Sequence, residues 1–173
     1  MTSAQPVEIN NSAVDPQRLR QALGQFSTGV TIITCLDAEL GRVGLTASSF
    51  TALSLDPPLV LWSLRLQSAQ LPAFSRNRHF VVNVLAQDQL SLSRRFASRR
   101  DDKFAEGQWF AGEGGAPVLG GSLAVFECEL ASQQDTGDHK LFIGRVLALS
   151  IDAGLSPPLV YQGGHYHGLG DTL

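Results

Sequence analysis

Small hydroxyl side chains are concentrated in residues 44–61, GLTASSFTALSLDPPLVL. Thr46, Ser48 and Ser49 follow a glycine and precede an apolar run. Hydroxyls and backbone N–H groups together can surround a phosphate without adding bulk. The stretch is therefore a candidate site for a phosphate-bearing ligand, and the alternative is a hydroxyl-rich strand edge without a ligand.

A basic segment, SRRFASRRDDKF at residues 93–104, combines four arginines and one lysine with two phenylalanines. Arginine binds phosphate through paired N–H donors and stacks on flat rings. Arg95 with Phe96 could therefore hold a phosphate and cover an aromatic ring. The alternative is a solvated helix face that binds nothing.

Three of the four histidines lie near glycines at predicted strand ends. His139 follows a Gly137-Asp138 turn, which would present it at a strand mouth within reach of a ligand; the alternative is a loop histidine paired with Asp138. His165 and His167 share one strand face, a spacing that can bind a metal. No Asp, Glu or Cys at ligand spacing completes a set, so we expect no metal site.

Common catalytic motifs are missing from the sequence, which contains no GxxxxGK[ST], HExxH or GxSxG. The glycines of GEGGAP, residues 112–117, lead to a proline and not into a helix. A helix N-terminus is what binds the pyrophosphate in a dinucleotide fold. We therefore predict a plain turn there and exclude that fold.

The elements that must position these residues are mostly short strands. Branched and apolar runs predict strands at residues 30–36, 59–64, 79–86, 122–132 and 139–150. One more strand is predicted to begin at residue 43, and another lies within 159–169. Helices are predicted at about 15–26, 68–76 and 88–97, starting at Asp15, Ser68 and Asp88. Mostly sequential strands with few helices predict a mainly β fold, a small antiparallel barrel of Greek-key type.

Composition restricts the class of protein. The chain has 173 residues, 43% of them hydrophobic, which suits one domain with a full core, predicted at residues 14–170 behind a flexible arm at 1–13. The formal charge of −3 argues against a nucleic-acid partner.

Cys35 and Cys128 lie alone in apolar runs and are expected to be buried thiols. With no signal peptide or membrane span in the sequence, we expect a cytoplasmic location and no membrane partner.

Seven segments, taken in order, resemble the short-chain flavin reductases, the NAD(P)H:flavin oxidoreductase components of two-component monooxygenases. They are FSTGVTIIT (26–34), GLTASSFTALSLDPPLVLWSL (44–64), FVVNVLA (80–86), RRFASRRDDKFAEGQW (94–109), PVLGGSLAVFECEL (117–130), GDHKLFIGRV (137–146) and PLVYQGGHY (158–166). The resemblance implies an FMN-binding split barrel that reduces free FMN or FAD. NADH or NADPH would give a hydride from nicotinamide C4 to flavin N5, and the reduced flavin would serve a separate monooxygenase. The alternative is a flavin carrier of the same fold that does not turn over nicotinamide.

The same resemblance implies a flavin groove at the interface of a homodimer. It places Gly44, Leu45, Thr46, Ser48 and Ser49 along the ring and ribityl chain, with Ser63, Leu64 and Arg65 similarly placed. It assigns the phosphate side to Ser68, Ala69, Gln70, Arg95 and Phe96, and the approach of the nicotinamide to His139, His165 and Tyr166, with His139 as the catalytic candidate. Since Ala69-Gln70 replaces the hydroxyl or basic residue usual there, we expect phosphate binding to depend mainly on Arg95.

Overall fold

The computed structural model describes residues 14–152, 154 and 156–171, so the predicted arm at 1–13 lies outside the described residues. Strands dominate this part of the chain, as predicted. They are β1 Thr28–Gly29, β2 Thr31–Asp37, β3 Gly41–Ala47, β4 Thr51–Leu55, β5 Pro58–Arg65, β6 His79–Val84, β7 Trp109–Ala111, β8 Pro117–Leu119, β9 Ala124–Thr136, β10 His139–Ile151, β11 Val160–Gln162 and β12 His165–His167. The helices are α1 Pro16–Leu23, α2 Leu71–Arg76 and α3 Leu90–Ala97, with short 3₁₀ turns η1 Gln87–Gln89, η2 Lys103–Ala105 and η3 Glu113–Gly115.

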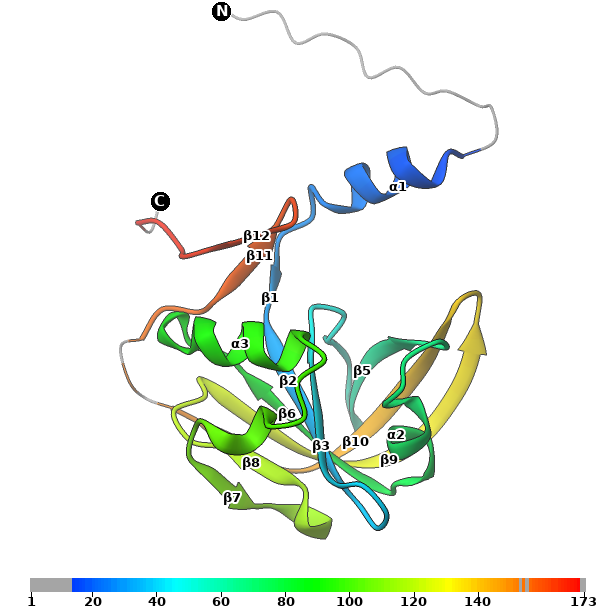
Figure 1. Cartoon of the computed structure of the whole chain (residues 1–173), viewed down its shortest axis with the longest axis vertical. Coiled ribbons are helices and arrows are strands. Elements are labelled where there is room, and N and C mark those ends of the chain that lie inside the picture. Colours follow the sequence, from blue (N-terminus) through cyan, green and yellow to red (C-terminus); the bar gives the residue numbers. More distant parts are fainter. Residues whose placement is uncertain (1–13, 153, 155, 172–173) are drawn as a thin grey trace, which may run out of the picture.

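Seven strands form one antiparallel sheet in the order β3-β2-β6-β9-β10-β5-β4 (Figure 1). The outermost strands, β3 and β4, are joined by residues 48–50 alone. A link that short brings both edges of the sheet together, so the sheet curls into an open barrel. Neighbours distant in sequence, β2 with β6 and β5 with β10, give the crossing connections of a Greek key. The predicted mainly β split-barrel fold is confirmed.

An aromatic cluster fills the barrel interior. The rings of Trp62 and Phe142 stack with centroids 4.4 Å apart, and Phe74 and Phe80 meet Trp62 edge-on. Gly144 of β10 has no side chain at the place where the Phe80 ring lies. Burying these rings supplies much of the apolar area that stabilises the barrel.

A second core lies outside the barrel, between the sheet and α3. Ile32 of β2 packs there with Leu92 and Phe96 of α3, whereas Ile33 and Cys35 belong to the interior cluster. Because β2 is buried on both faces, its sequence is an apolar run without alternation. Cys35 and Cys128 are free and buried, as predicted, and burial raises the pKa of each thiol to about 12.

Helix α1 projects away from the barrel beside the β11–β12 hairpin (Figure 1). Asp15 caps it by accepting a hydrogen bond from Arg18 N at 2.8 Å, and Pro16 opens it, as predicted. It ends at Leu23 and not at residue 26, because Gly24 follows and the next residues form a turn bonded to the last helical carbonyls. None of its residues is buried, and Leu23 and Phe26 are 65% and 76% exposed.

Some predicted boundaries were wrong. Helix α2 begins at Leu71 and not at Ser68, because Pro72 fits only the first turn; residues 68–70 form a separate turn. Helix α3 begins at Leu90 and not at Asp88. The Gln89 side chain accepts from Ala86 N and donates to Gly120 O, so residues 87–89 form the separate turn η1 before the helix. The sequence analysis also missed β4 and the β7–β8 hairpin. The turn predicted at residues 112–117 is present as η3 between those two strands.

Candidate active site

A cleft of about 600 Å³ opens where β3, the β5–α2 loop and the C-terminal end of α3 meet. We call it the α3 cleft. Its walls are Leu45 and Thr46 of β3, Leu64 of β5, residues 67–70, residues 96–101, and Lys103. Seven of the predicted flavin-site residues therefore line one cavity: Leu45, Thr46, Leu64, Ser68, Ala69, Gln70 and Phe96.

Gly44 shapes this cleft by letting α3 lie directly on β3. A Cβ atom at Gly44 would come within 2.7 Å of Phe96 Cε1 and 3.2 Å of Phe104 Cζ. Phe96 itself packs edge-on against Phe104, with ring centroids 5.0 Å apart. Gly44 thus supports the cleft wall from behind and is not itself among the lining residues.

The hydroxyls of the 44–61 stretch are largely engaged with the protein's own backbone. Thr46 Oγ1 donates to Ser93 O of α3 at 2.6 Å. Ser49 Oγ donates to Ser63 O and accepts from Ser63 N, both at 3.0 Å. These hydroxyls join β3 to α3 and the 48–50 link to β5, so Ser49 and Ser63 act as a structural pair. Among the described residues, Ser48 has no such partner for its hydroxyl.

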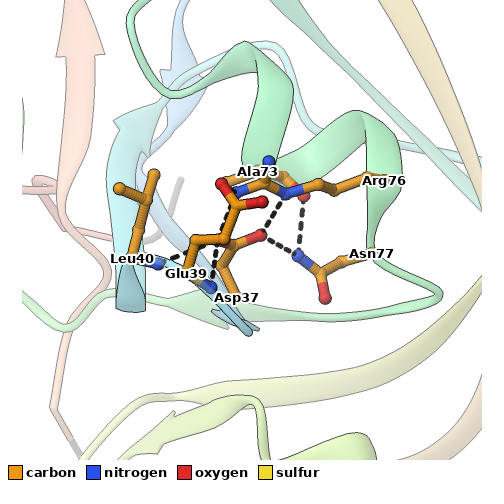
Figure 2. Close-up of polar contacts among 6 residues, drawn as sticks. All are labelled: Asp37, Glu39, Leu40, Ala73, Arg76 and Asn77. Atoms are coloured by element: carbon orange, nitrogen blue, oxygen red, sulfur yellow. Dashed lines mark hydrogen bonds and ion pairs between the residues drawn. The ribbon is translucent and has the colours of Figure 1, made fainter.

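Residues 67–70 lead into α2, which is fixed to the end of β2 by polar contacts with Asp37 (Figure 2). Asp37 accepts from Arg76 Nε at 2.7 Å, from Arg76 Nη2 at 2.5 Å and from Asn77 Nδ2 at 2.9 Å. Its Oδ1 also accepts from the backbone of Glu39 and Leu40. The Arg76 hydrogen bonds hold the pKa of the Asp37 carboxyl well below its usual range, against the opposing effect of desolvation.

Arg95, the residue expected to bind phosphate, is not among the residues that line the α3 cleft. Its guanidinium pairs with Asp102, at 3.0 Å from the carboxylate and 2.9 Å from the carbonyl oxygen, and with the Glu106 carboxylate. These partners offset its charge. The cations on the cleft are Arg99, Arg100 and Lys103.

Lys103 differs from the two arginines because its side chain is buried. The residue is 8% exposed, whereas Arg99 and Arg100 are exposed. Its Nζ donates to Phe96 O at 3.0 Å and to Gly44 O at 3.4 Å. None of the ion pairs found among the described residues includes Lys103. Burial lowers the pKa of this ammonium.

A smaller hollow of about 200 Å³ adjoins the cleft and shares Thr46 and Ala97 with it. Ser48, Tyr161 and Tyr166 complete its lining with Val30, and we call it the tyrosine hollow. The Tyr161 and Tyr166 rings meet with centroids 5.3 Å apart, and Tyr166 Oη accepts from Ser93 Oγ at 3.0 Å. The tail hairpin therefore brings Tyr166 into the tyrosine hollow beside the cleft.

The histidines lie near the cleft but do not line it. His139 is paired across strands with Arg65, the neighbour of Leu64, and its Nδ1 lies 2.7 Å from Asp138 Oδ1. This contact lowers the pKa of Asp138. His165 is exposed in the β11–β12 hairpin, with Nδ1 3.0 Å from Gly163 O. Across residues 14–152, 154 and 156–171, no group of three His, Cys, Asp or Glu side chains could hold a metal ion.

Comparisons with known proteins identify the family of this chain. The family model described as "Flavin reductase like domain" matches residues 23–170. The chain belongs to this family. It is 47% identical to the reductase subunit HsaB of a flavin-dependent monooxygenase from Rhodococcus jostii, over 91% of this chain and 80% of that protein. It is 41% identical to the FMN reductase (NADH) SmoA of Agrobacterium fabrum, over 96% and 97% of the two chains.

A solved flavin reductase has the same fold. The NADH:FAD oxidoreductase SgcE6 of Streptomyces globisporus, in complex with NAD and FAD fragments, superposes with a TM-score of 0.85 at 32% identity, covering 92% of this chain and 97% of that one. In the described part of the flavin reductase chain, no helix is long and apolar enough to cross a membrane.

Seven residues of the cleft in this flavin reductase were not singled out from the sequence: Gln67, Ala97, Ser98, Arg99, Arg100, Asp101 and Lys103. Six of them stand in the basic segment at 93–104, so its composition did signal the site. Arg95 is not among the lining residues, because its guanidinium is paired with Asp102 and Glu106, which follow it closely in the sequence. Acidic residues seven and eleven positions away are a signal that could have directed attention to the other cations.

Proposed function

We propose that this chain oxidises NADH or NADPH and reduces free FMN or FAD in the α3 cleft, supplying reduced flavin to a separate monooxygenase. The observation that carries the proposal is one cavity lined by seven of the residues expected around a flavin, in a chain of the flavin reductase family. The relatives named as a reductase subunit of a flavin-dependent monooxygenase and as an FMN reductase (NADH) support the donor and the recipient.

The residues of the α3 cleft fit a flavin. Its volume of about 600 Å³ lies within the usual range for small-molecule sites. Leu45, Leu64 and Phe96 offer apolar wall to a flat ring system. The exposed guanidinium groups of Arg99 and Arg100 offer charged donors to a phosphate. Lys103 is a buried cation with no carboxylate partner among the described residues and therefore suits an anionic ligand.

The bound flavin and the reduced nicotinamide supply the hydride chemistry, so the protein needs no acid–base pair of its own. The chain's part is to hold the two rings together and exclude water. Leu45, Thr46 and Leu64 would hold the flavin ring, while Ser68, Gln70, Arg99 and Arg100 would bind its phosphate. Tyr166 lines the tyrosine hollow next to the cleft, and His139 is paired with Arg65, the neighbour of the lining residue Leu64. We assign both to the approach of the nicotinamide.

We further propose that the chain works as a homodimer. An eight-residue helix is not stable alone in water. Helix α1 nevertheless forms, buries none of its own residues and leaves Leu19, Leu23 and Phe26 exposed. A second copy that covers this apolar stripe would explain why the helix forms.

The proposal is tested by mixing purified protein with NADH or NADPH and with FMN or FAD, in all four combinations, and following the loss of reduced-nicotinamide absorbance. We expect turnover in at least one combination. Flavin binding without turnover in any of them would mean that the chain is a flavin carrier and would contradict the proposal.

A further inference from the structure

We propose that Lys103 recognises the negative charge that the flavin ring acquires on reduction, and so binds reduced flavin in preference to oxidised flavin. This inference rests on the proposed function, because it takes the α3 cleft as the flavin site. It assigns to Lys103 a role separate from phosphate binding, which we leave to Arg99 and Arg100.

The inference rests on the position of the Lys103 ammonium. Lys103 is buried at 8% exposure on the wall of the cleft. Its only hydrogen bonds among the described residues go to two neutral carbonyls, Phe96 O at 3.0 Å and Gly44 O at 3.4 Å. A lysine ammonium has three N–H donors, so one donor is left over. A buried charge without an opposite charge is costly, and that cost falls when an anion arrives beside it.

Lys103 lies in the apolar part of the cleft. The two residues whose carbonyls it binds, Gly44 and Phe96, are in contact with each other, and Leu45 and Phe96 form the neighbouring wall. This is where a flat ring would lie. Arg99 and Arg100 are exposed at the rim, where a phosphate can keep part of its water shell. The two kinds of cation therefore meet different parts of one ligand.

The negative charge on the ring comes from the hydride transfer itself. A hydride brings one proton and two electrons to a neutral oxidised ring, while the reduced nicotinamide becomes the oxidised, positively charged form. After hydride transfer the ring would hold one extra negative charge. The Lys103 ammonium, fixed on the cleft wall, would stabilise that charge as it develops, without any protein group having to move.

The test is a set of binding measurements. Dissociation constants for riboflavin and FMN, oxidised and anaerobically reduced, are measured for the wild type, Lys103→Gln and Arg100→Gln. We expect Lys103→Gln to weaken binding of reduced riboflavin about tenfold more than that of oxidised riboflavin, which corresponds to a fall of about 30 mV in the two-electron potential of the bound flavin. Arg100→Gln should weaken FMN relative to riboflavin, and equally in both redox states.

Other outcomes overturn the inference. An equal loss in both redox states means that Lys103 only supports the wall, and a loss confined to FMN means that it binds phosphate. If Lys103→Gln does not fold, the midpoint potential of riboflavin bound to the wild type is measured instead. We expect it to be more positive than that of free riboflavin. An equal or more negative potential overturns the inference. A wild type that binds no flavin overturns the proposed function as well.

Discussion

One hydroxyl joins Ser49 to the backbone of Ser63, donating to its carbonyl oxygen and accepting from its N–H group, each at 3.0 Å. The two residues lie just beyond Thr51 and Leu61, which are paired in the β4–β5 ladder. The side chain thus continues the ladder to the neighbour of Leu64, on the cleft wall. Ser49, which the sequence suggests for ligand binding, therefore joins the 48–50 link to β5 beside the cleft wall.

Replacing this hydroxyl should destabilise the fold. Ser49→Ala leaves a half-buried N–H and C=O of Ser63 without their partner, and such a loss costs about 1–3 kcal/mol. Ser48→Ala is the matched control, because Ser48 is exposed and its hydroxyl is without a partner among the described residues. Urea denaturation should show a lower free energy of unfolding for Ser49→Ala alone. Equal values for the two variants would contradict the structural role.

The contact between β3 and α3 should be equally sensitive. Gly44→Ala places a Cβ atom 2.7 Å from Phe96 Cε1, so Phe96 must shift, and overpacking of this kind costs about 1–3 kcal/mol. Gly29→Ala is the control, since a Cβ atom there meets nothing within 4 Å. Thermal denaturation should show a lower Tm only for Gly44→Ala, together with weaker flavin binding because the cleft wall moves. An unchanged Tm would show that α3 is free to adjust.

The cations at the cleft rim should recognise phosphate. The double variant Arg99→Gln/Arg100→Gln should weaken FMN binding about tenfold or more, since a charge-assisted hydrogen bond is worth about 1.5–3 kcal/mol, and should leave riboflavin binding nearly unchanged. Arg95→Gln should show no such preference, because its guanidinium faces Asp102 and Glu106. Fluorescence titrations with both flavins measure this. A loss of FMN binding specific to Arg95→Gln would restore the sequence-based assignment.

Acid should act on the fold through Asp37. Its pKa is lower in the folded chain than in the unfolded chain, mainly through Arg76. Its contribution to stability is therefore complete above the ordinary carboxyl pKa of about 4 and is lost as the pH falls below that value. Asp37→Asn should flatten this part of the profile of Tm against pH, whereas Glu39→Gln, whose side chain is 74% exposed, should not. Parallel profiles for Asp37→Asn and the wild type would contradict this.

The long elements of the fold were predictable because their patterns are local. The β9–β10 hairpin, the strands β2, β5 and β6, and the cap of α1 at Asp15 follow from apolar runs and capping residues. Strand β4 was not predicted, because its residues are exposed or half-buried and pair only with β5. Such a strand depends on the sheet it joins and has no strong pattern of its own.

The site was predictable at the level of segments and less so at the level of atoms. The segments 44–61 and 93–104 and the turn at 68–70 contribute residues to the α3 cleft, and the tail contributes Tyr166 to the tyrosine hollow. Sequence could not show that Ser49 is bound to Ser63, that Arg95 pairs with its own acidic neighbours, or that Lys103 is buried with no carboxylate beside it among the described residues. Those outcomes depend on which side chains tertiary packing brings together.

The most direct measurement of the central claim is a crystal structure of this chain grown with FMN. We predict that the ring lies in the α3 cleft against Leu45 and Leu64, with its phosphate at the rim beside Arg99, Arg100 and Ser68. An FMN bound at another surface while this cleft contains only solvent would contradict the account.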